Sequence, residues 1–191
     1  MDQDPATMPA KTTLTDKDLR RLPRDGRKYE LVDGEIRVSP AGGRHGQISL
    51  ALGARLLAHV EAHRLGVVLD SSTGFRLPGR TPEQKDVRSP DVGFVAAGRL
   101  PNGAVPTGFL ELAPDLAVEV LSPDDLRREV LEKVGEFLDA GTRLVWVIDP
   151  RTRRAAVYRS LTDVRQLAED GILEGEDVVP GFSCPLRDVL A

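Results

Sequence analysis

The strongest constraint on the fold is the stretch 114–150, whose pattern predicts a strand, a helix and a second strand. Residues 116–121 are aliphatic apart from Glu119 and are bounded by prolines, as in a strand that is buried on both faces. Residues 144–148 form a second run of this kind. Two buried strands joined by a helix predict a parallel pair with a right-handed crossover, and therefore an α/β fold.

Glu119 is the one charge in the first of these strands. Burying a carboxylate costs several kcal/mol unless a cation or hydrogen-bond donors meet it. A charge inside an aliphatic strand therefore marks a candidate functional residue.

The helix between the two strands has recognisable end signals. Ser122 suits the N-cap, Pro123 the first helical position, and Gly141 the C-terminal cap. Lys133 falls at the margin of the apolar face, where it either joins a functional site or pairs with Glu129 one turn earlier. Taken alone, the local sequence favours the ion pair. The apolar face is predicted to consist of Leu126, Val130, Leu131, Val134, Phe137 and Leu138.

Composition limits the class of protein. A chain of 191 residues with 40% hydrophobic content suits one domain with a proper core, which we expect to span 13–191 after a disordered lead-in at 1–12. Apolar runs fall well short of the roughly 20 residues of a membrane helix, and the N-terminus has no signal-peptide core. The single cysteine, Cys184, excludes an internal disulfide and favours a reducing cytoplasm. The net charge of −4 gives no support to a broadly basic nucleic-acid binder.

A β-hairpin is predicted at 29–38, after a short helix that the capping-box pattern of 15–18 opens. Asp33 and Gly34 suit a two-residue type I′ turn, which fixes the register of the two strands. The preferred local explanation of Glu30 is then a cross-strand ion pair with Arg37. On the expected buried face, Leu31 lies opposite Ile36 and Tyr29 opposite Val38.

A long helix is predicted from about residue 45 to residue 63. Its apolar face carries Ile48, Leu52, Leu56 and Val60. His45 lies near its start, where it either contacts an anion or substrate or, as the favoured explanation, is an ordinary surface residue. His59 and His63 are one turn apart, but zinc is disfavoured because no third ligand is near.

Asp91 opens an apolar strand directly after Pro90. A turn residue at a strand start is the simpler explanation, since Asp is common there. Asp91 precedes Glu119 by 28 positions (119 − 91), through a connection rich in Gly and Pro, which suits neighbouring antiparallel strands with converging carboxylates. The basic residues before this strand either contact phosphate or belong to a solvated loop: Arg76, Arg80, Lys85 and Arg88, interspersed with Glu83 and Asp86.

Two carboxylates and a lysine in one sheet-and-helix unit are typical of metal-dependent phosphoester hydrolysis. Carboxylate oxygens suit Mg²⁺ or Mn²⁺, which keep waters that a phosphate can displace. Such an ion lowers the pKa of a bound water, and a lysine orients that water or stabilises the developing charge. Neither a Gly-x-Ser-x-Gly turn nor a P-loop is present in the sequence.

Five sequence blocks in order resemble one family over roughly residues 20–190: YELVDGEIRVSP, SPDVGFV, PDLAVEVLSPDD, EVLEKVGEFLDAGTRLVWVIDP and VPGFSCPL. The chain resembles the Uma-type restriction endonucleases of the PD-(D/E)xK nuclease superfamily. The resemblance implies a restriction-endonuclease-like α/β core, in which helices flank a mixed central β-sheet, with an N-terminal hairpin and a β-rich C-terminal tail. It also implies divalent-metal binding and hydrolysis of DNA.

The resemblance assigns roles to four residues. Asp91 matches the aspartate of the PD block and Glu119 the acidic residue of the next strand, so these two are the expected ligands of Mg²⁺ or Mn²⁺. The superfamily's lysine normally lies two residues after that acid, where this chain has Leu121; Lys133 fits a lysine that has moved to the helix. Glu30 matches a family acidic position and completes the expected catalytic set.

The predicted function is therefore a metal-dependent endonuclease with DNA as its substrate. The alternative is a catalytically silent member of the same fold that acts as a nucleic-acid-binding or oligomerisation module. A homodimer would suit the cutting of both strands, although no sequence feature marks an interface.

Overall fold

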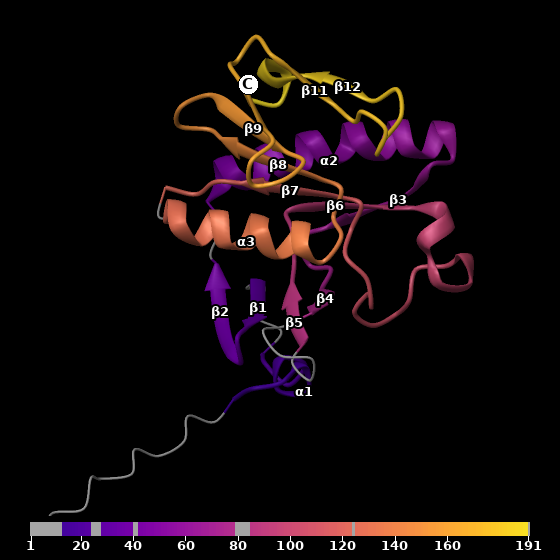
Figure 1. The fold of residues 1–191 in the computed structure, drawn as a ribbon, viewed down its shortest axis with the longest axis vertical. Coiled ribbons are helices and arrows are strands. Elements are labelled where there is room, and N and C mark those ends of the chain that lie inside the picture. The colour runs from indigo at the N-terminus through magenta and orange to yellow at the C-terminus, as the bar shows by residue number, and fades with distance from the viewer. Residues whose placement is uncertain (1–12, 24–27, 40–41, 79–84, 124, 191) are drawn as a thin grey trace, which may run out of the picture.

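The structure, a computed structural model, describes residues 13–23, 28–39, 42–78, 85–123 and 125–190. At its centre lies a mixed six-stranded sheet (Figure 1), in the order β10 (Val164–Leu167), β9 (Arg154–Tyr158), β8 (Leu144–Asp149), β7 (Leu116–Val120), β6 (Val92–Ala96) and β3 (Gly66–Asp70). The β7–β8 pair is parallel and the other four pairs are antiparallel. The predicted α/β class and the parallel strand–helix–strand unit are confirmed.

Helix α2 (Gly43–His63) covers one face of this sheet (Figure 1). All four residues of its predicted apolar face are fully buried, and they pack against sheet residues that include Val118 and Trp146. The C-terminal segment, with β11 (Ile172–Glu174) and β12 (Ser183–Pro185), joins the same core, where Phe182 stacks on Trp146 with ring centroids 5.9 Å apart. This face of the sheet is closed by apolar packing.

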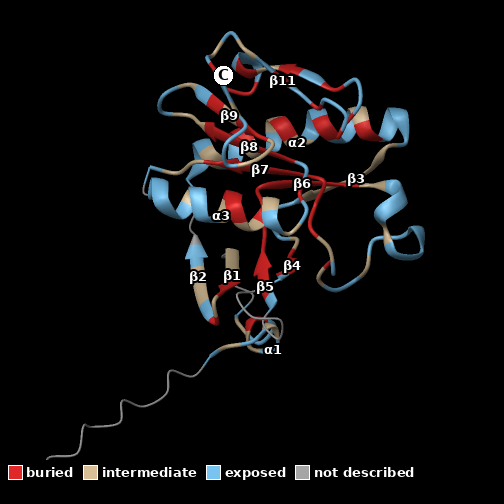
Figure 2. Ribbon diagram, viewed as in Figure 1, coloured by how far each residue is buried: buried red, intermediate tan, exposed pale blue. Residues whose placement is uncertain are grey.

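Helix α3 (Arg127–Asp139) covers the opposite face, where Val134 and Phe137 pack in one cluster with Ala117. Side chains alternate between the two faces of a strand, so Glu119, two residues after Ala117, projects toward α3. Strands β6, β7 and β8 are buried along almost their whole length (Figure 2). A polar side chain on this face therefore meets protein groups before it meets bulk water.

A second, four-stranded sheet lies beyond α3 (Figure 1), in the order β2 (Glu35–Ser39), β1 (Lys28–Val32), β5 (Lys85–Arg88) and β4 (Phe75–Pro78). The β1–β2 hairpin has the predicted register, including Glu30 opposite Arg37. Asp33 and Gly34 both have positive φ, 50° and 74°, as a type I′ turn requires. The short helix α1 (Asp16–Leu19) precedes it and has the predicted capping box between Thr15 and Asp18.

The predicted buried face of the hairpin is partly wrong. Val38 is 43% exposed, whereas Glu30 is only 5% exposed. The face that carries Glu30 is buried because Glu30 contacts Arg88, Ser89 and Lys133, which border the polar cleft described below. Alternation along a strand shows which residues share a face, but it cannot show which face meets the rest of the protein.

The predicted start of α3 is also wrong. Ser122 and Pro123 precede the helix, which begins at Arg127. Asp125 closes a turn instead: its carboxylate accepts the Ser122 N–H at 2.7 Å, and its own N–H donates to the Ser122 carbonyl at 3.1 Å. Leu126, predicted to be on the buried face, is consequently 58% exposed.

The predicted lead-in, residues 1–12, and the loop residues Arg80 and Glu83 lie outside the described residues. The predicted strands of the C-terminal tail are present as β9 and β10. Within the described ranges, no helix has the length and apolar character that a membrane crossing requires.

Candidate active site

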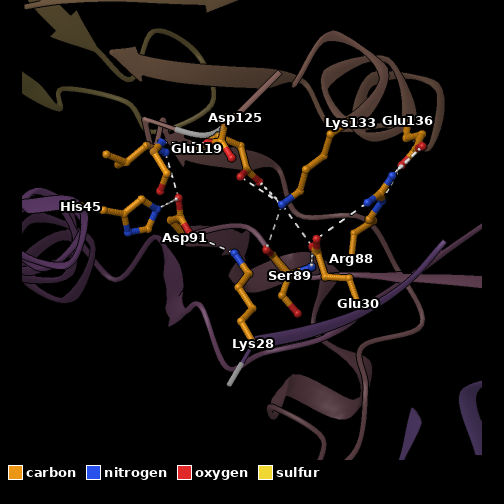
Figure 3. A network of polar contacts seen from close by, with 12 residues as sticks. Lys28, Glu30, His45, Arg88, Ser89, Asp91, Glu119, Asp125, Lys133 and Glu136 are labelled. Atoms are coloured by element: carbon orange, nitrogen blue, oxygen red, sulfur yellow. Dashed lines mark hydrogen bonds and ion pairs between the residues drawn. The ribbon is translucent and has the colours of Figure 1, made fainter. Parts of the chain in front are cut away.

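A cleft of about 320 Å³ opens on the α3 face of the central sheet, at the start of β6 and the end of β7. The β1–β2 hairpin and the first turn of α2 complete its walls. All four predicted site residues line it (Figure 3): Glu30, Asp91, Glu119 and Lys133. The structure thus brings together residues that are up to 103 positions apart in sequence (133 − 30).

The two predicted metal ligands lie side by side. Strands β6 and β7 are antiparallel and pair with Val92 opposite Val118, so Asp91 and Glu119 adjoin this pair at the same end. The Asp91 N–H also donates to the Val118 carbonyl at 2.9 Å. Both side chains line the same cleft. The two carboxylates therefore come together at one end of the antiparallel β6–β7 pair.

Asp91 is held by three donors. Its Oδ1 lies 2.9 Å from Lys28 Nζ, and its Oδ2 accepts hydrogen bonds from His45 Nε2 and the Val120 N–H, each at 2.8 Å. Burial alone would raise the pKa of Asp91, but the His45 hydrogen bond and the charges of Lys28, His45 and Lys133 outweigh it and hold the pKa well below its usual range. The Asp91 carboxylate is therefore ionised at neutral pH.

Glu119 is in the opposite electrostatic situation. Burial raises its pKa to about 7, and the nearby Asp91 and Glu30 charges reinforce this against the opposing attraction of Lys133. Lys133 Nζ donates to Oε2 at 3.0 Å. Oε1 lies 2.9 Å from the same nitrogen but accepts no hydrogen bond from any described residue. One buried carboxylate oxygen of the cleft thus lacks a hydrogen-bond donor among the described residues.

Lys133 lies between two glutamates. Besides Glu119, its Nζ contacts Glu30 Oε1 at 3.1 Å and donates to the Ser89 carbonyl at 3.3 Å. Burial would lower the pKa of Lys133, but the charges of Glu119, Glu30 and Asp91 together raise it above its ordinary value, so the ammonium stays charged. The local alternative, an ion pair with Glu129 one turn earlier, is wrong: the ion pairs of this lysine cross to β1 and β7.

Glu30 also departs from its preferred local explanation. Its ion pairs within the described residues are with Lys133 and, at 3.7 Å, with Arg88, rather than with Arg37 across the hairpin. The Ser89 N–H donates to Oε1 at 2.7 Å. Burial would raise the pKa of Glu30, but Lys133, Lys28, Arg88 and this hydrogen bond together lower it. Glu30 therefore anchors the ammonium group of Lys133.

Two of the basic residues that precede Asp91, Arg76 and Arg88, are engaged by acidic side chains of the protein, whereas Lys85 is exposed. Arg88 is almost fully buried and donates to Glu136 of α3 at 2.7 Å. Arg76 forms ion pairs with Asp16 and Glu111. Neither arginine is available for phosphate in this arrangement.

Two site residues escaped the sequence analysis. His45 was expected at an ordinary surface position, and Lys28 was not considered, yet both contact Asp91. A weak signal existed for Lys28, since residues 28 and 30 of one strand share a face. No local signal marks His45, because its contact depends on how α2 lies against β6.

The residues present fit an open divalent-cation site with oxygen ligands. Asp91 is ionised, and Glu119 has a buried oxygen without a hydrogen-bond donor. Among the described residues, no group of three or more His, Cys, Asp or Glu side chains is placed to hold a metal ion. Two carboxylates with remaining water ligands are typical of Mg²⁺ rather than of zinc.

Comparison with known proteins agrees with this geometry. The family model Uma2, described as "Putative restriction endonuclease", matches residues 16–187. A crystal structure from Anabaena variabilis, described as that of "a putative nuclease belonging to DUF820", has a TM-score of 0.78 and 23% identity, and the match covers 93% of this chain and 97% of that one. That likeness concerns the fold, and no curated protein matches. Because the family match spans nearly the whole chain, the protein belongs to the Uma2 restriction endonuclease family.

Proposed function

We propose that the protein is a metal-dependent endonuclease that hydrolyses phosphodiester bonds of DNA. The observation that carries this proposal is the grouping in one cleft of two paired strand carboxylates, Asp91 and Glu119, with the buried ammonium group of Lys133. Membership of the Uma2 family and the likeness in fold to a protein described as a nuclease support it.

Asp91 and Glu119 would hold the cation, Mg²⁺ or Mn²⁺. When bound, such an ion supplies positive charge that lowers the pKa of a water and polarises a phosphoryl oxygen. The Val120 N–H and His45 fix the orientation of the Asp91 carboxylate. At neutral pH Asp91 is ionised, whereas Glu119, with a pKa of about 7, is partly protonated, so Glu119 is the ligand that would lose a proton as the cation enters.

Lys133 would act on the substrate side of these ligands. Glu30 and Glu119 hold its Nζ at 3.1 and 3.0 Å, so the ammonium group is preorganised before the substrate arrives. From this position it orients the attacking water and stabilises the negative charge that grows on the phosphate oxygens. Glu30 serves as a positioning residue for Lys133, because its other contacts are with the backbone of Ser89 and with Arg88.

The test is nicking of supercoiled plasmid in Mg²⁺ and in Mn²⁺ by wild type and by Asp91→Asn, Glu119→Gln and Lys133→Ala. Each substitution is expected to lower the rate by about a hundredfold or more. Arg128→Ala is the matched control, because it removes a cation from the outer surface of the same helix, where the side chain is 80% exposed. Circular dichroism checks that every variant is folded.

The outcomes separate the hypotheses. Metal-dependent nicking that survives in Arg128→Ala and is lost in the other three supports the site as assigned. Nicking that persists in Lys133→Ala alone would restrict that lysine to a structural ion pair. If wild type cuts neither DNA nor RNA substrates in either metal, the silent binding module becomes the better hypothesis.

A further inference from the structure

A second cleft, of about 630 Å³, meets the candidate active site at Lys28, which lines both. Ser89 lines the second cleft and contacts Glu30 and Lys133 of the first through its backbone. Much of the remaining wall is formed by Leu19, Arg20, Leu22 and Pro23 around the end of α1 and by the loops 71–74 and 105–110. Its volume lies in the range of about 300–1,000 Å³ that is typical of ligand-binding clefts.

The charge of this cleft is unusual for the chain. The protein has 30 acidic and 26 basic residues, yet none of the described residues that line the second cleft is acidic. Two of them, Arg20 and Lys28, are basic. A third cleft, beside the outer surface of α3, is also lined by two basic residues, Arg127 and Arg128, but these are outnumbered by five acidic ones: Asp33, Asp86, Glu132, Glu136 and Asp139. Of these two clefts outside the candidate active site, only the acid-free one suits a polyanion.

Arg20 is placed to meet a phosphate. Its guanidinium carbon lies 4.7 Å from the centroid of the Phe109 ring, so the aromatic face holds the cation in the cleft. The donors of a guanidinium group lie in its plane, and stacking on a ring leaves them open to a bidentate acceptor. The side chain is exposed, so a ligand can reach it. The nearby carboxylate of Asp70, which precedes the 71–74 loop, does not line the cleft. Its Oδ1 accepts a hydrogen bond from the Ser72 hydroxyl at 2.6 Å.

We propose that the acid-free cleft holds the sugar–phosphate backbone of the DNA strand next to the bond that is cut, with Arg20 as a phosphate-binding residue. The strand passes over Lys28 and so reaches Asp91, which Lys28 contacts at 2.9 Å. The serine and threonine hydroxyls of the 71–74 and 105–110 loops suit the same backbone. This assignment rests on the proposed nuclease function and adds the path of its substrate.

The first test compares two neighbouring arginines. Arg20→Gln removes a cation that lines the cleft, whereas Arg21→Gln removes one whose side chain is 79% exposed and does not line it. Binding of a fluorescent single-stranded oligonucleotide is measured by anisotropy in Ca²⁺, with a gel to confirm that the strand stays whole. Arg20→Gln should weaken binding about fivefold and reduce the slope of log K against log salt by about 0.7, the value for one phosphate contact.

The second test adds a charge to the cleft. Thr107→Glu places a carboxylate on its rim, and Gln166→Glu places the same charge on β10, at the far edge of the central sheet. Thr107→Glu should weaken oligonucleotide binding by a similar factor, whereas Gln166→Glu should leave it unchanged. Thermal unfolding confirms that each variant is as stable as wild type.

The results test the proposed role of the cleft separately from the proposed nuclease function. A selective loss in Arg20→Gln and Thr107→Glu, with the reduced salt slope, supports the cleft. The proposal for the cleft would be overturned if wild type binds and cuts DNA but Arg20→Gln matches Arg21→Gln in affinity and salt slope. The proposed nuclease function would then still stand. Wild type that binds no oligonucleotide would overturn both.

Discussion

Each carboxylate of the candidate site is already paired with a cation of the protein. Lys28 and His45 contact Asp91, and Lys133 contacts Glu119. A divalent ion must therefore compete with these side chains for the same oxygens. Lys28 is the competitor most easily displaced, because it has a flexible stem and is 17% exposed at the junction with the acid-free cleft.

Lys28→Met should consequently strengthen metal binding. The substitution keeps most of the apolar stem and removes the ammonium group from Asp91 Oδ1. We expect the dissociation constant for Mn²⁺, measured by calorimetry, to fall several-fold. Lys17→Met, which removes the same charge from the surface of α1, should leave it unchanged. Weaker binding in Lys28→Met would instead show that the lysine orients Asp91 for the ion.

Metal affinity should also depend on pH through Glu119. The pKa of this group is raised to about 7, so below that pH a cation must displace a proton from it, whereas Asp91 is already ionised. Affinity should rise by up to about tenfold per pH unit from pH 5 to 7 and level off above. Calorimetry in buffers of different ionisation enthalpy should detect about one proton released per ion at pH 6. Release of none would contradict the raised pKa.

The raised pKa of Glu119 also determines how the folding stability of the metal-free protein changes with pH. Because the pKa of Glu119 rises from 4.5 in the unfolded chain to about 7, the folded metal-free protein binds more protons between these values. The stability contributed by this group is present below pH 4.5 and is lost as the pH rises through 7. A bound cation would remove this loss, since it replaces the proton on Glu119.

The sequence identifies the acidic half of the site but not all of its basic half. Glu119 stands out because it interrupts an aliphatic strand, and Asp91 because it opens the neighbouring one. The roles of Lys28 and His45 depend on contacts between β1, β6 and α2, for which no local pattern exists. The same limit applies to Lys133, whose local pattern favoured Glu129 and whose actual partners lie on two other elements.

Among the elements, α3 shows which end signals are decisive. Its C-terminal end is as predicted, because Gly141 adopts φ 100° and the N–H groups of Gly141 and Thr142 donate to the Leu138 and Phe137 carbonyls. Its N-terminal end is not, since serine and aspartate close turns as readily as they cap helices. The hairpin register was predictable for the opposite reason: a two-residue turn with positive φ at both positions leaves one pairing.

The cap at Gly141 can be tested through the backbone alone. A Cβ at Gly141 would contact nothing within 4 Å, so Gly141→Ala changes only the conformational preference at positive φ. We expect a loss of about 1 kcal/mol in the free energy of unfolding, measured in urea. Gly98→Ala is the control, because its Cβ site is equally open and its φ is not positive. Equal effects of the two substitutions would contradict the role of the cap.

For the whole molecule, the burial of β7 and β8 on both faces was predictable, and so was the approach of Asp91 and Glu119 from neighbouring strands. The second sheet was not, because β5 and β4 join the β1–β2 hairpin through pairings such as Leu31 with Val87 that are distant in sequence. This sheet brings Glu30 and Lys28 to the cleft. It also forms, with α1, part of the acid-free cleft that no sequence pattern indicated.

The charge of the molecule leads to a last prediction. The net charge of −4 and the acidic residues of the active cleft repel DNA, so wild type should bind an oligonucleotide weakly in a chelator and more tightly in Ca²⁺. The double variant Asp91→Asn, Glu119→Gln should bind more tightly than wild type in the chelator and lose the response to Ca²⁺. Asp170→Asn with Asp188→Asn changes the formal net charge equally but leaves the cleft unaltered, and should keep that response. If both double variants respond to Ca²⁺ alike, the ion acts through the general charge of the molecule, and Asp91 and Glu119 are not its ligands.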